Sequence, residues 1–185
     1  MRALEGGFAD SPRDAAHAFR AAMEAMARPG RIKTVAGAEP PAPLSVAAGV
    51  LMLTLADAGT PVHLAGETDC AEVRDWLRFH TGAPLAGPGE AIFAVGAWAA
   101  LQPLAAYPIG TPDYPDRSVT LIVEMPELCA EGAVLTGPGI AGEAALSLPE
   151  TAAFRENAAR FPLGLDFYFT SGARLAALPR TTRVA

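Results

Sequence analysis

The spacing of apolar residues near the start of the chain predicts a helix. The motif SPRD begins at Ser11 and is typical of a helix start, with Ser11 as the N-cap, a proline in the first turn and an acid three residues after the cap. Phe19, Met23 and Met26 then recur at helical spacing, so we expect them to form the buried stripe of this helix. The pair Pro29-Gly30 is expected to end it.

Two more helices are predicted in the first half of the chain. Residues 44–56 are apolar nearly all round, which is typical of a helix that is covered on several sides. Thr68 or Asp69 is expected to cap the next helix, with Glu72 placed for a capping box and Gly82 ending it. The inner face of that helix is predicted to consist of Val73, Trp76 and Leu77.

Short apolar runs predict strands between the helices. A fourth helix is expected over residues 149–159, and the last two strands are expected to form a hairpin around Ser171-Gly172. Strands that alternate with helices and end in an antiparallel pair predict an α/β fold, a three-layer domain with a central mixed sheet flanked by helices. A length of 185 residues suits a single domain over residues 1–185. The expected strands are 31–35, 60–64, 91–96, 119–125, 133–136, 165–170 and 174–178.

Charge and composition exclude several function classes. A formal net charge of −6 argues against nucleic acid and against an anionic membrane surface as partners. The longest apolar stretch, residues 44–56, is too short to span a bilayer, and residues 1–14 lack the apolar core of a secretory signal. Cys70 and Cys129 have no metal-binding or redox spacing, so we expect a reducing, cytoplasmic location.

The segment GPGIAG over residues 137–142 matches the glycine pattern of dinucleotide-binding proteins. That site needs a helix that starts within the loop, because the helix amides bind the pyrophosphate. Pro138 removes one amide, and only residues 143–148 separate the loop from Pro149. A glycine-rich turn is therefore the preferred interpretation.

Catalytic and cofactor chemistry find little support in the chain. Lys33 is the only lysine; it lies in a predicted strand without a supporting motif, so we expect it to be exposed and expect no pyridoxal phosphate. His17, His63 and His80 have no metal-ligand spacing. His80 could act as a general base, but no orienting partner is evident, and the end of a helix is its simpler location. With no nucleophile motif either, we name no catalytic residue, no metal ligand and no cofactor.

Two polar clusters and a cationic tail are the remaining candidates for binding. The stretch RFHTGAPL combines a cation, an imidazole and a hydroxyl at a predicted helix end, and GTPDYPDRS over residues 110–118 is a stiff, charged loop. Such side chains could bind an anion or a partner's backbone, or could close local salt bridges and turns. The binding or interface candidates are Arg78, His80, Thr81, Asp116, Arg117, Ser118 and Arg180.

Blocks of sequence spread over almost the whole chain carry a family resemblance. They read FRAAMEAMARPG, LTLADAGTPV, RFHTGAPL, GTPDYPDRSVT, LTGPGI, FPLGLDFYF and ALPRTT, in this order. With them the chain resembles the PhnH subunits of the bacterial carbon–phosphorus lyase system. The resemblance implies a fold similar to the large domain of pyridoxal-phosphate-dependent transferases, without the cofactor, and the lone Lys33 agrees with that loss.

The resemblance also implies a function in phosphonate breakdown. Similar subunits work with the G, I and J subunits in a core complex that converts ATP and alkylphosphonate to ribose 1-phosphonate 5-triphosphate, and they look homodimeric in isolation. The expected role is that of an accessory subunit that is inert alone, and the alternative is a subunit that contributes residues to a shared nucleotide or phosphonate site. As a hypothesis, one polar surface meets a partner or a phosphate-bearing ligand and consists of Arg78, His80, Asp116, Arg117 and Arg180.

Overall fold

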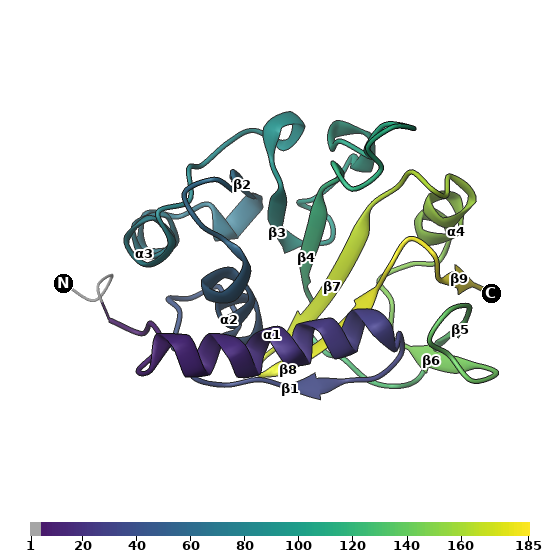
Figure 1. The fold of residues 1–185 in the computed structure, drawn as a ribbon, viewed down its shortest axis with the longest axis horizontal. Helices are drawn as coiled ribbons and strands as arrows, with labels where there is room; N and C mark the ends of the chain where they lie inside the picture. The colour runs from purple at the N-terminus through teal and green to yellow at the C-terminus, as the bar shows by residue number, and fades with distance from the viewer. Residues whose placement is uncertain (1–4) are drawn as a thin grey trace.

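A six-stranded mixed sheet forms the centre of the computed structural model, which describes residues 5–185 (Figure 1). Four neighbouring strands are parallel, and an antiparallel pair completes one edge, so the expected α/β fold with a mixed central sheet is confirmed. The spatial order of the strands is β1-β8-β7-β4-β3-β2. Their bounds are β1 Lys33–Thr34, β2 Val62–Leu64, β3 Phe93–Ala97, β4 Thr120–Glu124, β7 Asp166–Ser171 and β8 Arg174–Leu178.

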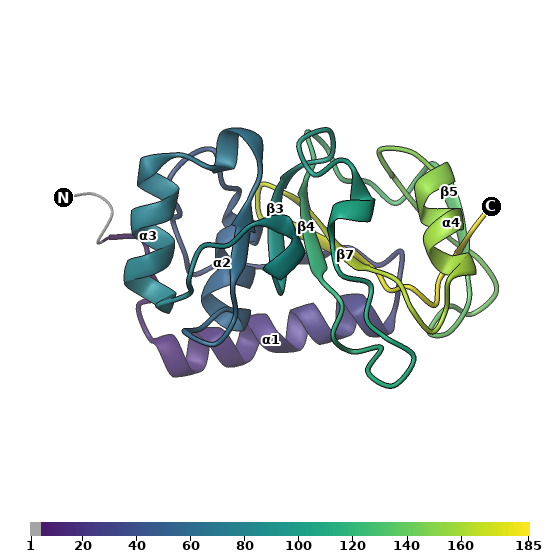
Figure 2. The same cartoon turned by 90° about the horizontal axis from the view of Figure 1, so that it is seen from above.

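The side chains of the sheet alternate between two separate cores. In β7, Tyr168 points to one side, whereas Phe167 and Phe169 point to the other. The Tyr168 side is covered by three helices, α1 (Ser11–Ala27), α2 (Val46–Leu55) and α3 (Ala71–Thr81), which form one layer (Figure 2). The strands are buried on both faces, as is usual for a parallel sheet.

The opposite face of the sheet departs from the expectation of flanking helices. It is covered by a single helix, α4 (Ala152–Ala159), and by a small antiparallel sheet, and no residue of another described α-helix belongs to the core on this side. The expected strand over 133–136 belongs to this small sheet, and one of its partners, Ala144–Leu146, was not predicted, because three residues rich in alanine give no period-two signal. The small sheet consists of β5 (Ala133–Thr136), β6 (Ala144–Leu146) and β9 (Arg183–Val184).

The buried stripe predicted for α1 is wrong. Phe19 and Met23 are exposed, at 48% and 52%, and Met26 is half-buried. The residues of α1 that are buried are Ala18, Ala22 and Ala25. These alanines repeat at helical spacing as well, and they let α1 approach α2 and β8 closely, so the smallest apolar residues and not the largest face the core.

A buried tyrosine fixes the orientation of α1. The Tyr168 hydroxyl donates a hydrogen bond to the backbone oxygen of Ala22 at 3.3 Å. Burial raises the pKa of Tyr168 to about 12, so this hydroxyl keeps its proton at physiological pH. The contact holds the alanine side of α1 against the sheet.

The predicted helix starts are corrected in detail. Asp10 and not Ser11 is the N-cap of α1, and the Asp14 carboxylate accepts a hydrogen bond from the Asp10 backbone N–H at 3.0 Å. Cys70 precedes α3 as its N-cap, whereas the Thr68 hydroxyl donates to backbone oxygens of the sheet layer and caps nothing. Helix α4 begins three residues after Pro149, at Ala152.

Other predicted features of the helices are confirmed. Helix α3 ends at Gly82, whose φ of 70° lies in the left-handed region that glycine adopts without strain. Its predicted inner face is fully buried, and α2 is buried over most of its surface. Lys33 lies in a strand as expected, but it is half-buried and forms an ion pair with Glu24.

Candidate functional site

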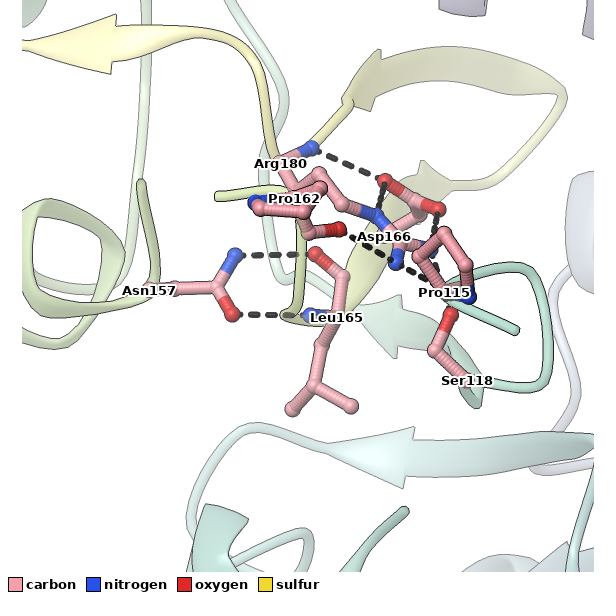
Figure 3. A network of polar contacts seen from close by, with 7 residues as sticks. All are labelled: Pro115, Ser118, Asn157, Pro162, Leu165, Asp166 and Arg180. Atoms are coloured by element: carbon pink, nitrogen blue, oxygen red, sulfur yellow. Dashed lines mark hydrogen bonds and ion pairs between the residues drawn. The ribbon is translucent and has the colours of Figure 1, made fainter. Parts of the chain in front are cut away.

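Arg180 is the centre of a polar network at the amino ends of β4 and β7 (Figure 3). Its backbone N–H and its Nε donate to Asp166 Oδ1 at 2.8 and 3.2 Å, and a terminal nitrogen pairs with Asp166 Oδ2. The other terminal nitrogen donates to the backbone oxygens of Pro115 at 2.7 Å and Pro162 at 3.4 Å. The Ser118 hydroxyl accepts the remaining bond.

This network uses the whole hydrogen-bonding capacity of Arg180. A guanidinium carries five N–H donors, and each of the five has an acceptor within the chain. The side chain is only 12% exposed. Arg180 therefore joins the 110–118 loop, the start of β7 and the C-terminal segment, and an external oxyanion would have to displace these acceptors.

A buried amide continues the network on the side of α4. Asn157 donates from Nδ2 to the Leu165 backbone oxygen and accepts from the Leu165 N–H, both at 2.8 Å (Figure 3). The paired bonds satisfy the buried amide as a backbone strand partner would. They fix the connection between α4 and β7 directly beside Asp166.

Two candidates of the same loop face solvent instead. Asp116 and Arg117 are exposed, and within residues 5–185 their side chains form no ion pair and no hydrogen bond. The Arg117 guanidinium lies over the Tyr114 ring, 3.9 Å from its centroid, and Tyr114 is itself half exposed. Stacking leaves the edges of a guanidinium available for an oxyanion.

The cluster at the end of α3 is used to close the helix and to pack the N-terminal segment. The Thr81 hydroxyl donates to the Leu77 backbone oxygen at 2.7 Å and accepts from the Ala83 N–H at 3.1 Å. The His80 ring packs against Trp76, with 5.1 Å between centroids, and its Nε2 lies 3.4 Å from the backbone oxygen of Glu5.

The N-terminal segment passes close to the His80 ring at the end of α3. A Cβ added to Gly7 would lie 2.5 Å from the His80 ring, so a larger residue where the N-terminal segment crosses the imidazole would displace that ring. Trp76 Nε1 also donates to the Glu5 oxygen, at 3.1 Å. Arg78 is the residue of this cluster whose charged group is exposed to solvent.

The structure divides the candidates into two groups. Ser118 and Arg180 are in contact, and Asp116 and Arg117 lie on the same loop as Ser118. Helix α3, with Arg78, lies at the opposite end of the molecule from α4 in both views (Figure 1 and Figure 2). Because Arg180 bonds the Pro162 oxygen just after α4, one continuous surface does not include all of them.

A second polar site, at the carboxyl ends of β4 and β7, was missed by the sequence analysis. Glu124 Oε1 accepts from the Ser45 backbone N–H at 2.7 Å, and Oε2 accepts from the Thr170 hydroxyl at 2.9 Å. Burial raises the pKa of Glu124, and the hydrogen bonds from Ser45 and Thr170 oppose that rise. The available signal was a carboxylate that ends an otherwise apolar strand, TLIVE.

One hollow of the surface has an acidic lining. It has a volume of about 880 Å³ and lies between the N-terminal segment and the start of α3. Cys70 and three prolines contribute to its wall, and its lining includes the glutamates Glu5, Glu39, Glu67 and Glu72. This concentration of carboxylates disfavours phosphate-bearing ligands such as nucleotides.

The remaining chemistry-bearing side chains are scattered or occupied. Within the described residues, no group of three or more histidine, cysteine or acidic side chains is placed to hold a metal ion. His17 is exposed on α1, and His63 lies in β2 with Nδ1 3.2 Å from the Ala86 oxygen. The Ser171 hydroxyl donates to the Pro126 oxygen.

None of the described helices is long and apolar enough to cross a membrane.

Comparison with known proteins identifies the family. Residues 6–185 match the family model described as bacterial phosphonate metabolism protein (PhnH). The chain belongs to the PhnH family. The match covers both polar networks and every helix and strand described above.

Two curated relatives are similar over nearly their full length. The alpha-D-ribose 1-methylphosphonate 5-triphosphate synthase subunit PhnH of Rhizobium meliloti (strain 1021) is 38% identical over 192 residues, covering 97% of this chain and 94% of the relative. The putative C-P lyase subunit protein HtxG of Stutzerimonas stutzeri is 29% identical over 198 residues, covering 97% and 95%. Both relatives are named as subunits, so the family resemblance inferred from the sequence blocks is confirmed.

Proposed function

We propose that this PhnH family member is an accessory subunit in phosphonate catabolism, required for the conversion of ATP and alkylphosphonate to ribose 1-phosphonate 5-triphosphate but without catalytic activity alone. The observation that carries the proposal is the match of residues 6–185 to the family, together with the relative named as a synthase subunit. The side chains support the same assignment, because the polar groups of Arg180, Asp166 and Glu124 form hydrogen bonds that connect distant segments of the chain.

The details of the proposal follow from the family resemblance. The chain is one domain that acts in the cytoplasm, forms a homodimer in isolation and joins the G, I and J subunits in the core complex. Its fold is that of the large domain of pyridoxal-phosphate-dependent transferases, without the cofactor. The ion pair of the single lysine, Lys33, with Glu24 supports the absence of a Schiff base at that position.

One observation favours the alternative of a shared ligand site. Arg117 is exposed, stacked on Tyr114 and free of an acidic partner within the described residues, which suits an oxyanion contact completed by another subunit. In that case this chain would contribute one arginine to a nucleotide or phosphonate site whose other groups lie on a partner.

Titration calorimetry of the purified chain separates the two possibilities. We expect no heat of binding with ATP or with methylphosphonate, because the acidic hollow repels anions and Arg180 has no free donor. Measurable binding to the isolated chain would favour the shared site, and turnover of either compound would overturn the accessory role. Co-expression with the G, I and J subunits followed by native mass measurement is expected to give a stable hetero-complex.

A further inference from the structure

The outward half of α1 carries two parallel strips of different chemistry. At 100° per residue, Pro12, Ala16, Phe19 and Met23 fall on one side of the helix, and all four are exposed. Arg13 and Arg20 follow one another on the adjacent side, Arg28 follows as the C-cap residue just after the helix, and all three are exposed. We call these the apolar strip and the arginine strip of α1.

The apolar strip cannot be covered by rotation of α1. The alanine side of the helix is packed against α2 and β8, and the Tyr168 hydroxyl holds the backbone of Ala22. Phe19 and Met23 therefore remain on the surface of the isolated chain, about half exposed, four residues apart on one face. Exposed apolar residues at this spacing are the kind of anchors through which one helix packs against another protein.

The arginine strip points to an extended acidic partner and not to a single phosphate. Arg13 and Arg20 lie seven residues apart, which is about 10 Å along the axis, and Arg28 lies beyond the last helical residue, Ala27. Three groups at this spacing do not converge on one oxyanion. Glu24, an acid close to Arg20 and Arg28, already pairs with Lys33, and within the described residues none of the three arginines has an ion pair.

The α1 helix of a second copy does not complement these strips. A two-fold axis that pairs two α1 helices antiparallel places the arginine strips opposite each other. A two-fold axis that pairs them parallel places the two arginine strips on opposite flanks of the helix pair, where neither strip meets an acidic side of the other α1. Both arrangements leave cations unpaired, so the surface fits a different protein.

We propose that the apolar and arginine strips of α1 form the docking surface for an acidic amphipathic helix of a partner protein. The partner's apolar residues cover Phe19 and Met23, and carboxylates on its flank pair with Arg13, Arg20 and Arg28. The inference rests on the proposed role as a subunit and adds the surface and the chemistry of the partner.

Co-expression of the full chain with the G, I and J subunits tests the proposal. The double variant Phe19→Asp/Met23→Asp is expected to lower the recovery of the hetero-complex by about tenfold or more. The charge reversal Arg13→Glu/Arg20→Glu, which leaves every apolar residue in place, is expected to lower it about tenfold at low salt and to show a weaker dependence on ionic strength than the natural chain. Melting temperatures and circular dichroism of both variants are expected to match those of the natural chain.

The matched control is Phe79→Asp, a similarly exposed phenylalanine on α3, and we expect it to leave recovery unchanged. Full recovery with both α1 variants would overturn this inference while leaving the proposed function standing. An equal loss with Phe79→Asp would also overturn it, as would an isolated dimer that α1 variants convert to a monomer. Failure of the natural chain itself to assemble would instead contradict the proposed function, and this inference with it.

Discussion

At the amino ends of β4 and β7 the cation of Arg180 neutralises Asp166, whereas at their carboxyl ends Glu124 is buried with neutral donors only. Both networks connect segments that are distant in the sequence. The first reaches from Pro115 to Arg180, and the second joins the start of α2 to β4 and β7. Asp166 pairs with a guanidinium that is fully hydrogen-bonded, whereas burial raises the pKa of the Glu124 carboxylate, which has no cation partner.

The difference bears on function because α/β folds bind ligands at the carboxyl ends of parallel strands, where the strand order reverses. Here the parallel strands lie side by side in the order β7-β4-β3-β2. Along the chain each new strand is added on the same side of the one before, so the strand order does not reverse among them. The position next to Glu124 is occupied by the N-terminus of α2, through the Ser45 N–H. The parallel strands therefore lack the reversal at which such folds form their usual ligand crevice, and the carboxylate at the end of β4 is bonded by the start of the chain's own helix α2.

The strongest test of the amino-end network is Arg180→Ala. Its removal leaves Asp166 without a cation and frees the Pro115 and Pro162 oxygens, so we expect the free energy of unfolding to fall by about 3 kcal/mol. Urea denaturation measures the change. Arg180→Lys keeps one charge but loses the fork, and an intermediate loss is expected. A loss below about 0.5 kcal/mol for the alanine variant would mean that the network contributes little to stability.

Glu124→Gln tests the carboxyl-end network through pH. A folded-state pKa above the ordinary value of 4.5 stabilises the fold below pH 4.5, and this contribution is lost as the pH rises through the raised pKa. Glutamine keeps an acceptor for the Ser45 N–H without a charge, so the variant lacks this loss.

The measurement is the difference in unfolding free energy between Glu124→Gln and the natural chain across the pH range. We expect it to move in favour of the variant as the pH rises above 4.5 and then to become constant, with a size below about 2 kcal/mol. A difference that moves the opposite way would show that the bonds from Ser45 and Thr170 outweigh burial.

Much of the fold could be predicted because its signals are local. Strong strands such as 119–125, the αL glycine at position 82 and the apolar helix over 44–56 follow from residue type and period. The buried face of α1 could not be read in this way. Alanine is compatible with both surface and core, and only the close approach of α2 and β8 decides that Ala22 is buried and Phe19 is not.

The candidate site was predictable only as a set of residue types. Arg117 and Arg180 look alike in sequence, each near hydroxyl groups and prolines. Their difference depends on Asp166, which is distant from Arg117 in sequence and lies beside Arg180 across the β7–β8 hairpin. Pairing through a tertiary contact leaves no local pattern, so sequence cannot tell a cation that binds within the chain from one that faces outward.

Arg117→Ala is expected to have the smallest effect on stability, and it tests whether the 110–118 loop takes part in assembly. Its side chain contacts only the exposed Tyr114 ring, so we expect the melting temperature to shift by no more than about 2 °C. If the loop meets a partner or a phosphate-bearing ligand, the same variant lowers recovery of the hetero-complex or growth on methylphosphonate. The matched control is Arg174→Ala, an exposed arginine at the start of β8. Unchanged assembly and growth with Arg117→Ala would exclude a binding role for this loop arginine, and the polar loop would then serve, like Arg180, to hold the chain's own segments in place.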